Sequence, residues 1–191
     1  MNKMYIIAGP NGVGKTTLSY TILPEMFECY EFVNADEIAR GISPLNPEKA
    51  GIRAGRLMLQ RIKELIKEGE SFALETTMAT KIYRKLIESA KNLGYEVILL
   101  FLTLESVELA IERVRTRVKE GGHDIPVETI ERRFHGGLTN FFEIYLGIVD
   151  KWILIDNSTE KFEFIAEGSD SEIIIRSERK WHNLKSQYNG N

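Results

Sequence analysis

The sequence predicts an α/β fold in which a mainly parallel, five-stranded sheet is flanked by helices. Short apolar runs alternate with helical segments along the chain, and this order favours a parallel sheet. Residues 97–102 read Val-Ile-Leu-Leu-Phe-Leu, an uninterrupted apolar run that is typical of a central strand covered on both faces. A glycine-rich segment follows the first apolar run, as expected for a tight connection between a strand and a helix.

The predicted strands are apolar runs rich in β-forming residues. They cover residues 3–8, 30–33, 72–74, 96–103 and 152–155. The third run leads into the polar sequence Glu75-Thr76-Thr77. Two further runs, at 162–166 and 172–175, predict a short C-terminal hairpin with Gly168 in its turn.

The predicted helices are the segments between these runs, where apolar residues recur at helical spacing or capping residues mark an end. They cover residues 15–23, 47–67, 81–93, 106–119, a segment from about 126 onward, and 177–188. Pro24 is expected to end the first helix, and Leu57 is expected on the buried face of the second. No linker, repeat or low-complexity tract interrupts the pattern, so residues 1–191 are expected to form a single domain.

The composition narrows the class of protein. The formal net charge of −3 gives no general nucleic-acid footprint, so a nucleic-acid partner is not expected. The single cysteine, Cys29, cannot form an internal disulfide, and no cysteine and histidine residues have zinc-site spacing. No apolar run is long enough for a signal region or a membrane span, so the expected location is cytoplasmic and the membrane is not an expected partner.

Residues 9–16, Gly-Pro-Asn-Gly-Val-Gly-Lys-Thr, match the Walker A pattern. Its glycines allow the backbone to turn its N–H groups toward phosphate oxygens, and the helix that follows adds the positive end of its dipole. The lysine ammonium would neutralise phosphate charge, and the Thr16 hydroxyl would bind Mg²⁺. The expected nucleotide-binding residues of this loop are Gly9, Pro10, Asn11, Gly12, Val13, Gly14, Lys15, Thr16 and Thr17.

Polar residues follow three of the predicted strands, at the sheet edge where parallel α/β proteins bind their ligands. Asp36 and Glu75 are the candidates for carboxylate chemistry. Asp36 has a second interpretation as the N-cap of a short helix at 37–40, and Glu75 has one as a solvated strand end. Walker B strands ordinarily end in aspartate, whereas this strand leads into Glu75. Two roles therefore stay open for Glu75, which are ordering the water shell of a metal and contacting substrate. The Asp156-Asn157-Ser158 segment is expected to be a structural turn or part of a base-binding wall.

Four arginines predict a lid over the triphosphate, at about residues 113–134. Arg113 and Arg117 share one helix face, Arg132 and Arg133 belong to the next helix, and a polar glycine-containing turn lies between the two helices. Arginine suits this role because its planar fork binds phosphate oxygens at two points. The competing interpretation is a solvated charged face, and His123 in the turn is expected to stabilise the turn rather than to catalyse.

Together these residues resemble the zeta-toxin-like family of P-loop kinases, in particular its stand-alone bacterial branch. The resemblance rests on residues 9–17, on 34–40 (Asn-Ala-Asp-Glu-Ile-Ala-Arg), on 75–77, on the lid, and on 156–158. It implies the P-loop fold of small kinases and an ATP- and Mg²⁺-dependent transfer of phosphate to a sugar hydroxyl of UDP-N-acetylglucosamine. It also implies inhibition by an antitoxin protein.

The resemblance assigns roles residue by residue. Asp36 matches the base that deprotonates the sugar hydroxyl, and Lys15 and Thr16 match the phosphate and metal residues. Arg117 and one of Arg132 and Arg133 match the lid arginines. The expected catalytic residues are therefore Asp36, Lys15, Arg117 and Arg132, and Arg113 and Arg133 are expected to bind the nucleotide. The expected substrate residues are Asn34, Arg40, Glu75 and Thr76.

Two other functions remain open at this point. The first is a P-loop kinase with a different acceptor, such as a nucleotide, another sugar or the end of a nucleic acid, since a fold does not decide among acceptors. The second is a nucleotide-dependent binding module that transfers no phosphate. ATP is the expected nucleotide by resemblance.

Overall fold

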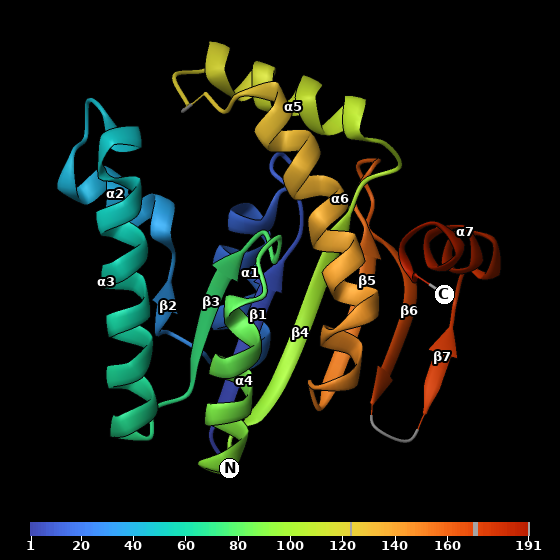
Figure 1. Cartoon of the computed structure of the whole chain (residues 1–191), viewed down its shortest axis with the longest axis horizontal. Helices are drawn as coiled ribbons and strands as arrows, with labels where there is room; N and C mark the ends of the chain where they lie inside the picture. The colour runs from blue at the N-terminus through green and yellow to red at the C-terminus, as the bar shows by residue number, and fades with distance from the viewer. Residues whose placement is uncertain (123, 170–171, 191) are drawn as a thin grey trace.

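A computed structural model describes residues 1–122, 124–169 and 172–190 (Figure 1). Its sheet has the strand order β2-β3-β1-β4-β5-β6-β7. The strands are β1 (Lys3–Ala8), β2 (Phe32–Val33), β3 (Phe72–Thr76), β4 (Glu96–Thr103), β5 (Lys151–Asp156), β6 (Glu163–Ser169) and β7 (Ile173–Ile175). The pairs from β2 to β5 are parallel, and β6 and β7 extend the sheet as an antiparallel hairpin. The α/β fold with a parallel five-stranded core is confirmed.

Helices cover both faces of the sheet and its upper edge in Figure 1. They are α1 (Lys15–Phe27), α2 (Ala35–Ile42), α3 (Pro47–Glu68), α4 (Ile82–Asn92), α5 (Val107–Lys119), α6 (Val127–Glu143) and α7 (Glu178–Tyr188), with a 3₁₀ turn at Tyr145–Gly147. α3, α4 and α6 lie in front of the sheet, α1 lies behind it, and α5 crosses the carboxyl ends of the strands (Figure 1). None of the helices in the described residues is long and apolar enough to cross a membrane.

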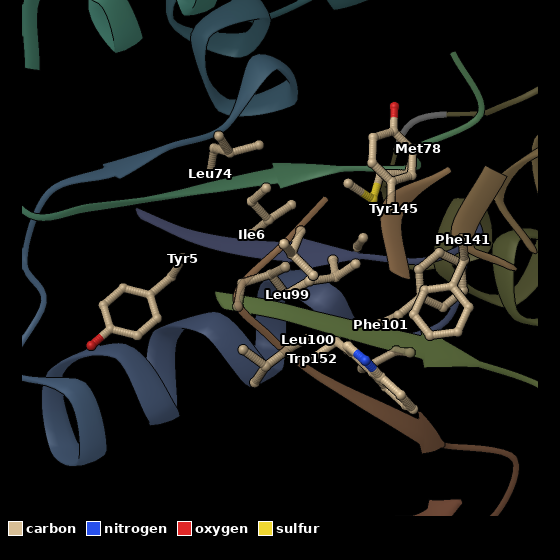
Figure 2. Packing of buried hydrophobic residues seen from close by; sticks show 14 of the residues in the cluster. Tyr5, Ile6, Leu74, Met78, Leu99, Leu100, Phe101, Phe141, Tyr145 and Trp152 are labelled. Carbon is tan, nitrogen blue, oxygen red and sulfur yellow. The ribbon is translucent and has the colours of Figure 1, made fainter. Parts of the chain in front are cut away.

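The core between the sheet and the front helices is aromatic at one end. Phe141 of α6 packs against Phe101 of β4 with ring centroids 4.8 Å apart, and Trp152 of β5 lies beside them (Figure 2). Trp181 of α7 stacks on Trp152 at 5.6 Å. This packing holds α6 and α7 on the sheet, and α6 carries Arg132 and Arg133 in its N-terminal half.

Three expectations about single residues were wrong. α1 does not end at Pro24 but continues to Phe27. The missing N–H of Pro24 removes one hydrogen bond of the last turn, while the Phe27 ring stacks on Tyr5 with centroids 4.5 Å apart. Leu57 is 38% exposed because the buried stripe of α3 runs through Ala54, Met58, Ile62 and Leu65 instead.

The third concerns Gly168, which does not occupy a turn but lies within β6, opposite Trp152. A Cβ atom at this position would lie 2.6 Å from the Trp152 ring, well inside van der Waals contact. The glycine is therefore required by the indole packed across it, and not by the turn of the hairpin.

Candidate active site

The phosphate loop joins β1 to α1, and its glycines have the backbone conformations that the motif predicts. Gly9, Gly12 and Gly14 all have positive φ angles, of 140°, 78° and 89°. A Cβ atom on Gly9 would lie 2.2 Å from the carbonyl oxygen of Leu102, so no other residue fits there. Asn157, after β5, donates a 2.8 Å hydrogen bond to the carbonyl oxygen of Val13 and holds the loop from the other side.

Lys15 is buried within the loop rather than extended into solvent. Its ammonium group donates a 2.9 Å hydrogen bond to the Pro10 carbonyl oxygen and lies 3.9 Å from Oε1 of Glu75. Burial lowers the pKa of Lys15, while the charges of Glu75 and Asp36 act in the opposite direction. A cation already removed from bulk water is well placed to neutralise a phosphate group.

Glu75, near the carboxyl end of β3, lies beside Thr16 in the first turn of α1. The Thr16 hydroxyl donates to Oε2 of Glu75 at 2.8 Å, and the side-chain amide of Asn34 donates to the same oxygen at 2.9 Å. Burial raises the pKa of Glu75, and the charge of Lys15 and the hydrogen bond from Thr16 oppose that shift. This arrangement places Glu75 on the phosphate side of the site.

The Thr16 hydroxyl and the Glu75 carboxylate are hard oxygen donors, which suit Mg²⁺. Among the described residues no cluster of three or more histidine, cysteine, aspartate or glutamate side chains could hold a metal alone. The donor set therefore fits a magnesium ion that takes its other ligands from phosphate oxygens and water, as is usual for this ion.

Asn34 is a buried cap that directs Asp36. Its Oδ1 accepts hydrogen bonds from the backbone N–H groups of Asp36, at 2.8 Å, and of Glu37, at 3.4 Å. The interpretation of Asp36 as the N-cap of α2 is therefore wrong, because Asn34 has that role. The side chain of Asp36 is exposed and lines a cleft.

This cleft of about 400 Å³ lies between α2 and α3 on one side and the α5–α6 segment on the other. Its charged lining has both signs. The charged residues are Asp36, Arg40, Glu48, Arg117, Asp124 and Arg133. Nη1 of Arg133 donates to Oδ1 of Asn11 at 3.2 Å and so connects the cleft to the phosphate loop. Burial lowers the pKa of Arg133, and the charge of Asp36 opposes that shift.

The other predicted residues lie at varying distances from this cleft. Arg132 is exposed and is absent from the cleft lining, in contrast to its neighbour Arg133. Arg113 donates to the carbonyl oxygen of Ser158 at 3.0 Å. Arg40 lines the cleft and pairs with Glu37 at 2.8 Å.

Two of the predicted threonines point elsewhere, and the turn residue of the lid is not described. Thr17 is exposed on α1. Thr76 is buried, and its hydroxyl accepts a 3.0 Å hydrogen bond from the N–H of Met78, a residue with a positive φ of 52°. Thr76 thus shapes the turn after β3 rather than the cleft. The expectation for His123 falls outside the described residues.

A polar network behind the phosphate loop was only partly foreseen. Asp156 accepts from the backbone and hydroxyl groups of Ser158 and from Lys180 of α7, the latter at 2.5 Å. The polar triplet after β5 signalled a turn, and Asn157 turns out to support the loop. Nothing in the sequence marked Lys180, which reaches the triplet from a helix 24 positions away.

The comparisons with known proteins agree with this arrangement. The zeta toxin family model matches residues 2–169. An uncharacterised protein of Haemophilus influenzae is 32% identical over 133 residues, which are 70% of this chain and 93% of that protein.

Solved structures with low sequence identity share the fold. The AvrRxo1-ORF1:AvrRxo1-ORF2 complex gives a TM-score of 0.78 at 15% identity, over 96% of this chain, and was also solved with ATP. This chain spans 63% of the length of that relative. The PezAT chromosomal toxin–antitoxin system of Streptococcus pneumoniae gives a TM-score of 0.68 at 16% identity, over 100% of this chain and 80% of that one.

The family model covers most of the chain, and it spans the phosphate loop, Asp36, Glu75 and the arginines of the cleft. This match confirms the family membership that the motifs predicted. The chain belongs to the zeta toxin family and has the fold of the P-loop kinases.

Proposed function

We propose that the protein transfers the γ-phosphoryl group of ATP, with Mg²⁺, to a hydroxyl group of a small polar molecule bound in the cleft. Membership of the zeta toxin family supports nucleotide-dependent phosphotransfer in general. The observation that carries the finer proposal is that Asp36 and Arg133 line one cleft, while Arg133 also binds Asn11 of the phosphate loop. A candidate base and a candidate phosphate ligand are thus next to the triphosphate cradle.

The donor half of the site would work through charge and position. Lys15 and the N–H groups of the loop would bind the β- and γ-phosphate oxygens of ATP, and Arg133 would bind the transferred group from the cleft side. Thr16 and Glu75 would hold Mg²⁺, which supplies charge neutralisation at the bridging phosphates. This gives Glu75 a metal-side role, in place of the substrate contact expected from the resemblance.

Asp36 would act as the general base. Its carboxylate takes the proton of the acceptor hydroxyl as the acceptor oxygen bonds to the γ-phosphorus. The bond between that phosphorus and the β,γ-bridging oxygen breaks, and the electron pair leaves with ADP. Arg117 and Arg133 would stabilise the charge on the transferred group, because guanidinium groups bind phosphate oxygens at two points.

The charged lining of the cleft supports the proposed acceptor. Both carboxylates and guanidinium groups line the cleft, and this suits a molecule with several hydroxyl groups and an anionic part. UDP-N-acetylglucosamine, the acceptor implied by the family resemblance, has both features. We also propose an antitoxin protein as a partner. The support is the family resemblance and the similar PezAT structure, which belongs to a toxin–antitoxin system.

The test is to incubate the purified protein with Mg²⁺-ATP and UDP-N-acetylglucosamine and to analyse the small molecules by mass spectrometry. We expect a phosphorylated sugar nucleotide that is missing with Lys15→Ala and Asp36→Asn. Production of ADP without a phosphorylated sugar would reject this acceptor and favour another nucleotide, sugar or nucleic-acid end. Nucleotide binding without transfer to any acceptor would reject the kinase and leave a binding module.

A further inference from the structure

A second hollow lies away from the cleft and is lined by residues of α3 and α4. Figure 1 shows where these two helices lie. Its volume is about 1040 Å³. Each helix contributes apolar residues at helical spacing. They are Leu59 and Ile66 from α3, and Ile82 and Leu86 from α4, with Leu93 after its end. Ile82 is 52% exposed and Leu93 is 61% exposed, so the core leaves these side chains in contact with water.

Basic side chains surround this apolar floor. They are Lys63 and Lys67 of α3, Lys81 before α4, and Arg84 and Lys85 of α4. Arg84 pairs with Glu88 at 2.9 Å. For the four lysines no carboxylate lies within ion-pair distance in the part of the chain that the structure describes. The concentration of positive charge is notable because the whole chain has a net charge of −3.

The carboxylates of α3 do not neutralise this rim because they pair elsewhere. Glu64 and Glu68 lie 3.8 and 3.6 Å from the guanidinium group of Arg61. Arg61 in turn binds Glu31, at 3.0 Å, in the segment before β2. Glu64 and Glu68 thus belong to the ion-pair group around Arg61. Lys63 and Lys67 line the hollow beside α4, where they can pair with carboxylates of a ligand.

We propose that the groove between α3 and α4 binds an acidic amphipathic helix of a partner protein. Apolar residues of that helix would cover Leu59, Ile82 and Leu93, while flanking carboxylates would pair with the lysines of the rim. An amphipathic helix typically binds by laying its apolar face into a hydrophobic groove of this kind. The proposal does not depend on the phosphotransfer reaction, because the groove uses the C-terminal half of α3 and the cleft uses its first turns.

The shape and chemistry of the groove favour a protein helix over other ligands. A membrane surface is contacted by apolar side chains on a convex face, whereas these apolar side chains line a hollow. A nucleic acid would be attracted to the lysines but would leave the apolar floor uncovered, and no aromatic side chain among the lining residues offers a base-stacking surface.

The test uses a designed 20-residue helical peptide with a leucine stripe and glutamate on its flanks, labelled with a fluorophore. Fluorescence anisotropy gives its affinity for the wild-type protein and for two charge-reversed variants. One is Lys63→Glu/Lys85→Glu on the rim. The other is Lys161→Glu/Arg179→Glu, which changes two exposed residues outside the groove and alters the net charge equally.

We expect the peptide to bind the wild type, with an affinity about tenfold lower for the rim variant at low salt and unchanged for the control variant. A peptide with lysine in place of glutamate should not bind. Equal binding of both peptides, or equal effects of both variants, would overturn the proposal. So would binding of phosphatidylserine vesicles without binding of the acidic peptide, or a dimer of the wild type that the rim variant abolishes.

Discussion

The hydroxyl group of Thr16 donates a 2.8 Å hydrogen bond to Oε2 of Glu75, across 59 positions of the chain. Parallel pairing of β1 with β3 brings the two together, because Glu75 lies near the carboxyl end of β3 and Thr16 lies in the first turn of α1, which follows β1 through the phosphate loop. On the proposed function, a carboxylate in contact with the Walker threonine would act on the metal side of the site. This contact is the basis for two predictions about Glu75.

Glu75→Gln should lower kcat by about 10²–10³, in the range found for loss of one group that stabilises charge in the transition state. It should also raise the Mg²⁺ concentration needed for half-maximal rate, because glutamine has no negative charge to attract the ion. Initial rates measured over a Mg²⁺ titration would show both effects. An increase in KM for the acceptor with an unchanged Mg²⁺ requirement would instead support the substrate contact that the sequence predicted for Glu75. Glu160→Gln, at an exposed position, is the matched control.

Glu75 should also make stability depend on pH. Burial raises the pKa of this carboxyl in the folded protein, so the folded state keeps its proton to a higher pH than the unfolded chain does. In the window between the unfolded and the folded pKa, the folded state binds more protons, and stability falls as the pH rises. Glu75→Gln removes this pH dependence, because glutamine does not titrate.

The measurement is the free energy of unfolding by urea for both proteins from pH 4.5 to pH 8. The variant should gain stability relative to the wild type as the pH rises, until the folded pKa is passed. A constant difference over the whole range would contradict the raised pKa. These experiments need no ligand, so their outcome is independent of the proposed reaction.

The sequence was sufficient for the parts of the site that are local in the chain. The phosphate loop is one continuous motif whose glycines must adopt particular φ angles, so pattern and geometry coincide. The strand at 96–103 was predicted with its observed bounds because its apolar run is long and uninterrupted. An apolar run of this kind is expected in the middle of a sheet whichever segments pack on it.

The sequence could not decide what depends on packing between distant segments. Arg132 and Arg133 are adjacent, and successive residues of a helix point about 100° apart. Which of the two reaches the phosphate loop depends on how α6 packs on distant segments, among them Phe101 of β4. The continuation of α1 beyond Pro24 likewise depends on Tyr5, a partner that no local pattern reveals.

The arginine pair gives a matched test of the lid. Arg133→Ala should lower kcat/KM at least about tenfold, since it removes a half-buried charged group beside both Asp36 and Asn11. Arg132→Ala should stay within about twofold of the wild type, because surface substitutions of this kind have small effects. Steady-state kinetics on the two variants would distinguish them. A larger loss for Arg132→Ala would restore the catalytic role expected for that residue from the sequence.

Asn157 should matter for nucleotide affinity although it touches no reacting atom. Its amide group donates to the Val13 carbonyl oxygen, and removing one such bond costs about 1 kcal/mol, or about fivefold in affinity. Asn157→Asp is the informative change, because the carboxylate has the same shape but cannot donate and would face the same carbonyl oxygen. Titration calorimetry with Mg²⁺-ATP should show weaker binding for Asn157→Asp than for Asn157→Ala. Equal affinity for all three proteins would remove Asn157 from the support of the loop.

Gly168 allows a test of the packing that holds α6 and α7 on the sheet. Gly168→Ala places a methyl group 2.6 Å from the Trp152 ring and should cost about 1–3 kcal/mol, the usual range for overpacking a core. Gly55→Ala, in the middle of α3 with no heavy atom within 4 Å of the new Cβ, should instead stabilise by about 0.5–1 kcal/mol.

Urea unfolding of both glycine variants measures the difference, and Trp152→Phe in the Gly168→Ala background separates a steric cause from a backbone one. The smaller phenyl ring should recover part of the lost stability, because it withdraws the atoms that the methyl group meets. If the two substitutions were simply additive, the clash with the indole ring would not be what requires glycine at this position.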